Sequence, residues 1–145
     1  MDLGSGAGLP GILVAILRPD LEITLLEPLL RRSTFLLECV ERLQLDNVQV
    51  LRGRAEDVVG EVLADVVLAR AVAPLARLAR WAVPLLRDNG KLLAIKGANA
   101  DAELADAERV LKSLGVVETE MLRIGETVVV PATTVVKVRI GRRRR

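Results

Sequence analysis

The sequence opens with DLGSGAGLPG at residues 2–11, and this stretch decides how the rest of the chain is interpreted. Three alternating glycines, Gly4, Gly6 and Gly8, follow a short apolar strand end and precede an apolar run. Glycine adopts positive φ readily and has no Cβ, so the backbone can turn tightly and approach a ligand closely. A following helix directs its free N–H groups and its positive dipole end at such a turn. The stretch therefore predicts a strand, a ligand-binding turn and a helix.

The apolar pattern that follows alternates between strand-like and helix-like runs, which is typical of βαβ units around a parallel sheet. We expect helices over residues 10–18, 36–43, 74–86 and 104–114, and strands over residues 22–26, 48–51, 65–69 and 91–95. Asp88-Asn89-Gly90 predicts a turn before the last of these strands. Two further β-rich runs, 116–124 and 128–140, predict a closing antiparallel hairpin at the sheet edge.

The composition indicates one domain with an aliphatic core. The 145 residues are 51% hydrophobic, but only Phe35 and Trp81 are aromatic, and we expect Trp81 in the core. The only cysteine, Cys39, lies on an apolar helical stripe, excludes an internal disulfide framework and indicates a reducing compartment. We expect a domain over residues 1–140 and a basic tail over residues 141–145, whose arginines suggest a polyanionic partner.

No apolar stretch reaches the ~18 residues of a membrane span, so no membrane partner is expected. The chain begins Met-Asp, without a basic and then apolar leader, which predicts a cytoplasmic protein. We also expect a monomer.

Three nucleotide motifs compete for the glycines. A phosphate-binding P-loop fits the spacing of Gly6 and Gly11 but lacks its lysine and hydroxyl, because Ile12 and Leu13 follow. The dinucleotide fingerprint Gly-x-Gly-x-x-Gly fits Gly6, Gly8 and Gly11, with Glu27 about 20 residues further on. That interpretation would place Gly4 inside the preceding strand, where glycine is disfavoured.

The third motif is acid–apolar–Gly-x-Gly-x-Gly, formed by Asp2, Leu3, Gly4, Gly6 and Gly8. Here the turn begins at Gly4, and Asp2 stands at the carboxyl end of the first strand, beside the ligand. This pattern resembles motif I of class I S-adenosylmethionine-dependent methyltransferases, whose Rossmann-like α/β sheet carries helices on both faces. At the end of the second strand, Glu27 is placed to accept hydrogen bonds from both ribose hydroxyls of either cofactor.

Later motifs extend this resemblance. The acid of Ala55-Glu56 stands where class I methyltransferases commonly contact adenine, and LLRDNGKL at 85–92 resembles their turn before the fifth strand. The order and spacing of motifs between residues 2 and 97 resemble the RsmG (GidB) family. These motifs are GSGAGLPG at 4–11, LEP at 26–28 with Arg31-Arg32 and Phe35-Leu36, GRAE at 53–56, ARAVAPL at 69–75, and Lys96-Gly97.

That resemblance implies methylation of N7 of a guanine in 16S ribosomal RNA, with S-adenosyl-L-methionine as cofactor and ribosomal RNA or the 30S subunit as partner. It implies cofactor contacts at Gly4, Leu9, Ala55, Glu56 and Arg70. No metal is expected.

Methylation of guanine N7 needs few catalytic side chains. N7 of guanine has an in-plane lone pair and no proton to lose, so attack on a sulfonium methyl group needs no general base. In-line positioning can supply ~7–11 kcal/mol. A chain without histidine suits this reaction and suits acyl transfer or zinc hydrolysis poorly. Arg70 and Lys96 are the candidate substrate-facing residues, and Arg31, Arg32 and Arg54 could form a phosphate-contacting rim.

Two other functions stay open. One is an NAD-linked oxidoreductase that uses Gly6, Gly8 and Gly11. The other is an inactive, N-terminally truncated fragment that binds RNA, because members of the RsmG family normally carry a helical segment before the first strand. We therefore expect a truncated first strand and an apolar in-frame strand upstream of Met1. We also expect weak cofactor binding and poor methylation by this chain.

Overall fold

The computed structural model describes residues 1–70 and 72–142. Its strands are β1 (Asp2–Leu3), β2 (Ile23–Glu27), β3 (Val48–Arg52), β4 (Ala64–Arg70), β5 (Leu86–Lys96), β6 (Val116–Ile124) and β7 (Thr133–Ile140). The α-helices are α1 (Gly11–Leu17), α2 (Leu30–Arg42), α3 (Leu75–Ala82) and α4 (Ala100–Ser113), with short 3-10 helices η1 (Ala55–Val58) and η2 (Val83–Leu85).

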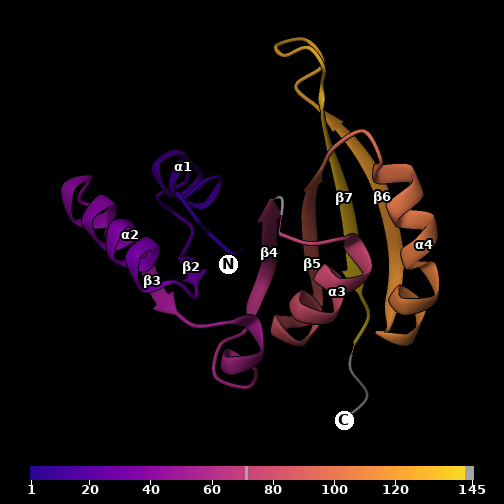
Figure 1. The fold of residues 1–145 in the computed structure, drawn as a ribbon, viewed down its shortest axis with the longest axis horizontal. Helices are drawn as coiled ribbons and strands as arrows, with labels where there is room; N and C mark the ends of the chain where they lie inside the picture. Colours follow the sequence, from indigo (N-terminus) through magenta and orange to yellow (C-terminus); the bar gives the residue numbers. More distant parts are fainter. Residues whose placement is uncertain (71, 143–145) are drawn as a thin grey trace.

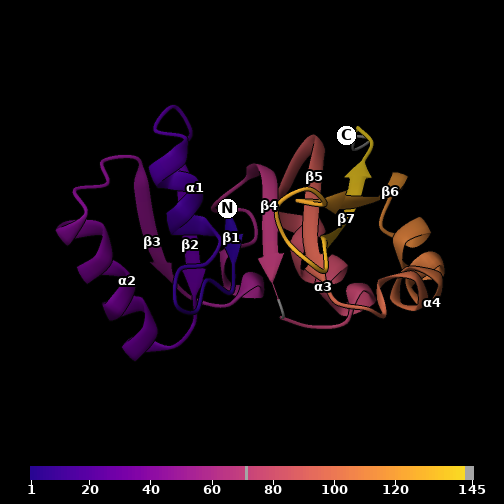
Figure 2. The same ribbon diagram turned by 90° about the horizontal axis from the view of Figure 1, so that it is seen from above.

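These strands form one seven-stranded sheet in the order β3-β2-β1-β4-β5-β7-β6. Strands β1 to β5 pair in parallel, whereas β7 runs antiparallel to both β5 and β6. Viewed from above, β3 and β6 lie at opposite ends of the sheet (Figure 2). The predicted α/β sheet with a closing antiparallel hairpin is therefore confirmed.

The first strand is only two residues long, yet it occupies the middle of the sheet. Leu3 pairs with Leu26 of β2 on one side and with Ala69 of β4 on the other. The Met1 ammonium donates to the Val66 carbonyl oxygen at 2.8 Å, which extends this pairing by one residue. The carboxyl ends of β1, β2, β4 and β5 therefore meet at one edge of the sheet, where ligands bind in open α/β sheets.

Two apolar clusters cover the two faces of the sheet. Successive residues of a strand point to opposite faces, and Leu25 and Leu26 of β2 accordingly belong to different clusters. The smaller cluster joins Leu25 to Ile12 of α1 and Leu36 of α2, whereas the larger joins Leu26 to α3 and α4. Helices therefore lie on both faces, with α1 and α2 toward the β3 end and α3 and α4 toward the β6 end (Figure 1).

Most predicted elements are confirmed, with shifted boundaries. Helix α2 begins at Leu30 instead of residue 36, and α4 begins at Ala100 instead of residue 104. Strand β5 begins at Leu86, but its pairing with β4 jumps from Ala64–Leu86 to Val66–Lys91. The predicted turn at residues 88–90 is therefore a bulge within the strand, where Asn89 takes a φ of 61°. Strand β7 begins only at Thr133, because residues 128–132, of which 128–131 are exposed, form the loop that projects beyond the sheet in Figure 1. Helix α3 ends at Ala82, just before the segment that contains Pro84.

Several sequence-based interpretations concern single residues. Cys39 is half-buried and packs against the smaller cluster, and Trp81 is half-buried against the larger one. Of the predicted basic tail, residues 143–145 lie outside the described residues. Within the described part of the chain, no helix has both the length and the apolar character that a bilayer span requires.

Candidate functional site at the carboxyl edge of the sheet

The glycine turn joins β1 to α1 over residues 4–10. Gly4, Gly6 and Gly8 have φ values of 68°, 56° and 91°, a region that other residue types enter only with strain. A Cβ on Gly8 would also overlap the side chain of Ile12, one turn further on. The alternating glycines are therefore required by the backbone path, and the turn begins at Gly4, as the motif that includes Asp2 predicts.

Asp2 lies behind this turn. The residue is only 1% exposed, and its Oδ2 accepts a hydrogen bond from the Gly11 N–H at 3.0 Å, at the start of α1. The Ser5 hydroxyl donates to the Asp2 carbonyl oxygen at 3.0 Å. Burial raises the pKa of the Asp2 carboxyl, and the Gly11 hydrogen bond partly opposes that shift. In this arrangement Asp2 holds the turn against the helix, a different position from the ligand-facing one that the motif suggests.

Glu27 ends β2 beneath the same turn and is 2% exposed. Its Oε2 accepts a hydrogen bond from the Gly6 N–H at 2.8 Å, and its Oε1 accepts one from the Leu29 N–H at 3.1 Å. The Glu27 carboxylate thus joins the glycine turn to the segment that leads into α2. Each oxygen keeps a further lone pair that could accept a hydrogen bond from a ligand.

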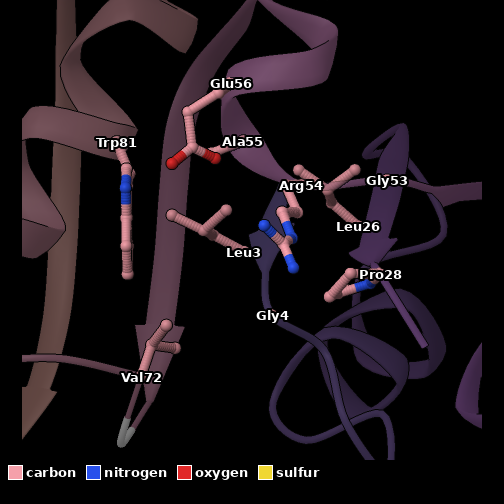
Figure 3. A pocket seen from close by; sticks show the side chains of 10 residues that line it. All are labelled: Leu3, Gly4, Leu26, Pro28, Gly53, Arg54, Ala55, Glu56, Val72 and Trp81. Atoms are coloured by element: carbon pink, nitrogen blue, oxygen red, sulfur yellow. The ribbon is translucent and has the colours of Figure 1, made fainter.

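A cavity of about 300 Å³ opens beside the turn (Figure 3). Its walls come from the ends of β1 and β2, from the segments that follow β3 and β4, from η1 and from α3. They are formed by Leu3, Gly4, Leu26, Pro28, Gly53, Arg54, Ala55, Glu56, Val72 and Trp81. The structure therefore brings together Gly4, Ala55 and Glu56, three of the predicted contact residues. The mostly apolar walls carry the Glu56 carboxylate, which suits a planar base with an amino group, and the Arg54 guanidinium.

A second, wider cavity of about 920 Å³ lies at the ends of β4 and β5. It shares Val72 with the first cavity, so a ligand in one lies next to a ligand in the other. Its walls are formed by Arg70, Val72, Ala73, Pro74, Ile95, Lys96, Gly97, Asn99, Ala102, Glu103 and Asp106. Arg70 is exposed at the end of β4 and can reach an anionic ligand there.

Lys96 is held inside the fold. Its side chain is 7% exposed, and Nζ lies 2.8 Å from Glu103 Oε2 and donates to the Ala73 carbonyl oxygen at 2.6 Å. Glu103 Oε2 also accepts a hydrogen bond from the Leu75 N–H at 3.0 Å, and the Lys96 hydrogen bond lowers the pKa of the Glu103 carboxyl. Lys96 thus connects β5 to α3 and α4, and these bonds occupy the amine that sequence reasoning directed at the substrate.

Other predicted residues lie at the margin of the site. Leu9 is 39% exposed on the outside of the turn and, in the described part of the chain, lines neither cavity. Arg31 and Arg32 are exposed on the first turn of α2, and Arg54 lies across the first cavity from Trp81 (Figure 3). Sequence reasoning did not assign Val72, Pro28 or Trp81 to the cavity, because only the fold brings these distant segments together.

Comparison with known proteins decides the family. The family model described as GidB, rRNA small subunit methyltransferase G, matches residues 1–129. The chain belongs to this family. The rRNA small subunit methyltransferase G of Thermobifida fusca is 59% identical over 97% of this chain, and that of Streptomyces avermitilis is 60% identical over 97%. The chain covers 59% of the length of each of these two relatives.

Comparison with solved structures agrees with membership of the rRNA small subunit methyltransferase G family. The S-adenosylmethionine-dependent methyltransferase SibL superposes with a TM-score of 0.78 at 17% identity, covering 97% of this chain and 50% of SibL. At that identity the likeness concerns the fold, which is that of class I S-adenosylmethionine-dependent methyltransferases. None of these findings supports the NAD-linked oxidoreductase that the spacing of Gly6, Gly8 and Gly11 left open.

Proposed function

We propose that this chain carries the cofactor and target-base sites of an S-adenosylmethionine-dependent methyltransferase that acts on N7 of a guanine in 16S ribosomal RNA. The observation that carries the proposal is the pair of adjoining cavities that share Val72 at the carboxyl edge of the sheet. A transfer reaction needs such a pair, because donor and acceptor must lie side by side. Family membership supports the choice of ribosomal RNA.

The residues of the first cavity fit S-adenosylmethionine. The Gly4 turn leaves space where a Cβ would approach Val72 Cγ2 to 3.2 Å, Glu27 ends the neighbouring strand, and Ala55-Glu56 forms the far wall. Glu56 could accept a hydrogen bond from the base, and Glu27 from the ribose hydroxyls. When bound, S-adenosylmethionine supplies an electrophilic methyl group on a positively charged sulfur.

The side chains around the two cavities would position the two reactants. Guanine N7 attacks through a lone pair and releases no proton, so no residue has to act as a base. Arg70 stands on the rim of the second cavity, where it can hold the target nucleotide by a phosphate or base edge. The Lys96–Glu103 ion pair stabilises the wall of that cavity. We place the reaction in the cytoplasm, on the 30S subunit or its RNA, with the protein as a monomer.

Two measurements test the proposal. Calorimetry should detect binding of S-adenosylhomocysteine to the chain and no binding of NAD at the same concentration. A dissociation constant above the micromolar range for S-adenosylhomocysteine still agrees with the proposal. Methyl-tritiated S-adenosylmethionine should label 30S subunits at a guanine N7, mapped by chain cleavage at 7-methylguanosine. Preferred binding of NAD, or label at another guanine atom, would contradict the proposal.

A further inference from the structure

The geometry points to Trp81 as a wall of the base compartment that determines which ring the first cavity accepts. We infer that its indole face contacts the adenine ring of a bound adenosine-containing ligand. The inference rests on the proposed function for the identity of that ligand. It assigns to Trp81 a binding role in addition to the core packing that its apolar neighbours suggest.

Helical geometry explains why Trp81 reaches the cavity. Helix α3 buries Leu75, Leu78, Ala79 and Ala82, all at most 1% exposed, against the sheet. At roughly 100° per residue, Trp81 lies about 110° from the centre of that stripe. It therefore stands at the margin of the buried face, packed against the core on one side and lining the cavity on the other.

The close-up view shows how the ring is presented (Figure 3). The indole is seen edge-on, so its flat face is turned toward Leu3 and the interior of the cavity. Arg54 and Pro28 lie on the opposite side, and the Glu56 carboxylate lies at one end, between Trp81 and Leu3. A flat aromatic wall of this kind suits a planar ring, because stacking and edge contacts between rings add to the stabilisation by apolar burial.

The carboxylate at that end selects among planar rings. An ionised carboxylate only accepts hydrogen bonds, so Glu56 favours a base with an amino group and disfavours one with a carbonyl oxygen at the same position. Adenine presents its 6-amino group, whereas hypoxanthine presents an oxygen there. The compartment formed by Trp81, Ala55 and Glu56 therefore fits adenine better than hypoxanthine.

Trp81 is also a built-in probe, because the chain contains one tryptophan and no tyrosine. We expect S-adenosylhomocysteine and adenosine to change the Trp81 emission saturably, inosine to do so only at higher concentration, and methionine to leave it unchanged. By calorimetry, Trp81→Leu should weaken S-adenosylhomocysteine binding roughly 5- to 150-fold, the range expected from losing one base–aromatic contact.

A matched control removes the other aromatic ring. Phe35→Leu changes an exposed side chain on α2 that, within the described residues, lines neither cavity, and it should leave the affinity within twofold. Circular dichroism during urea unfolding checks that both variants fold, and the emission experiment needs no substitution at all.

The outcomes separate this inference from the proposed function. Calorimetric binding of S-adenosylhomocysteine without any emission change, together with unaltered affinity in Trp81→Leu, would overturn the role of Trp81 and leave the methyltransferase proposal standing. An emission change with adenosine but no binding of S-adenosylhomocysteine would support Trp81 and contradict the methyltransferase. Absence of both signals would overturn both.

Discussion

Replacing Glu27 with glutamine tests the contact that joins the glycine turn to the second strand. The substitution keeps the size of the side chain but changes one acceptor oxygen into an NH2 donor. In the original chain, both Glu27 carboxylate oxygens accept hydrogen bonds from backbone N–H groups, one from Gly6 at 2.8 Å and one from Leu29 at 3.1 Å. Glutamine can accept only one of these hydrogen bonds, so the other N–H would face a donor.

The size of the effect follows from burial. Glu27 is 2% exposed, so water cannot readily replace the lost acceptor. An unsatisfied buried polar group costs about 1–3 kcal/mol, and we expect Glu27→Gln to lower the free energy of unfolding by that amount. If the same free energy is needed to restore the turn on binding, S-adenosylhomocysteine affinity falls roughly 5- to 150-fold, since about 1.4 kcal/mol corresponds to a factor of ten.

Urea unfolding measures the first quantity and calorimetry the second. The matched control is Glu22→Gln, an exposed glutamate just before β2 that should change neither. Adenosine and 2′,3′-dideoxyadenosine separate two roles of Glu27: a lost preference for adenosine in the variant indicates a hydroxyl contact, whereas an equal loss for both indicates the turn alone. A variant within about 0.5 kcal/mol of the original stability, with unchanged affinity, would refute the reasoning.

Three further predictions concern stability. Gly8→Ala should lower the free energy of unfolding by more than the ~1–2 kcal/mol of left-handed backbone strain, because the added Cβ also overlaps Ile12. The control is Gly60→Ala, which shows the strain alone, because Gly60 has a φ of 86° and open space around it. Equal losses of stability in the two variants would contradict the packing argument. Lys96→Met should lower the free energy of unfolding, measured in urea, by about 2 kcal/mol. This is less than the ~3–5 kcal/mol for breaking a fully buried ion pair, because the Glu103 side chain is 30% exposed. A loss under about 0.5 kcal/mol would show that the ion pair contributes little to stability. The ion pair lowers the pKa of Glu103, so its stabilisation is present above the ordinary value of 4.5 and is lost as the pH falls through the folded value. The difference in stability between the original chain and Lys96→Met should therefore hold from about pH 7 down to 4.5 and shrink below 4.5. A difference that stays constant below 4.5 would exclude this linkage.

The sequence predicted the parts of the site that local rules determine. Alternating glycines before an apolar run require a turn with positive φ, and Glu27 follows from its place at the end of a strand. The parallel sheet and the closing hairpin followed from the alternation of periodic segments. These features depend on residues that lie close together in the chain, which is why pattern and spacing were sufficient.

Features that depend on tertiary packing were harder to predict. The partner of Lys96 is Glu103 on α4, and only the packing of α4 beside α3 brings this carboxylate to the end of β5. The turn signal at residues 88–90 falls at a bulge within β5, because Leu86 already pairs with Ala64 of β4 before the register shifts to Val66 and Lys91. Trp81 reads as core because its helical neighbours are apolar, and only its place at the margin of the buried stripe exposes one face to the cavity.

The two buried carboxylates also govern how the turn moves. The amide hydrogens of Gly6 and Gly11 are bonded to Glu27 and Asp2, so both should exchange with solvent at rates usually associated with regular secondary structure. A turn that is already rigid loses little conformational entropy when a ligand arrives. Acidic side chains behind a glycine-rich segment can therefore make a flexible composition behave as a preorganised receptor.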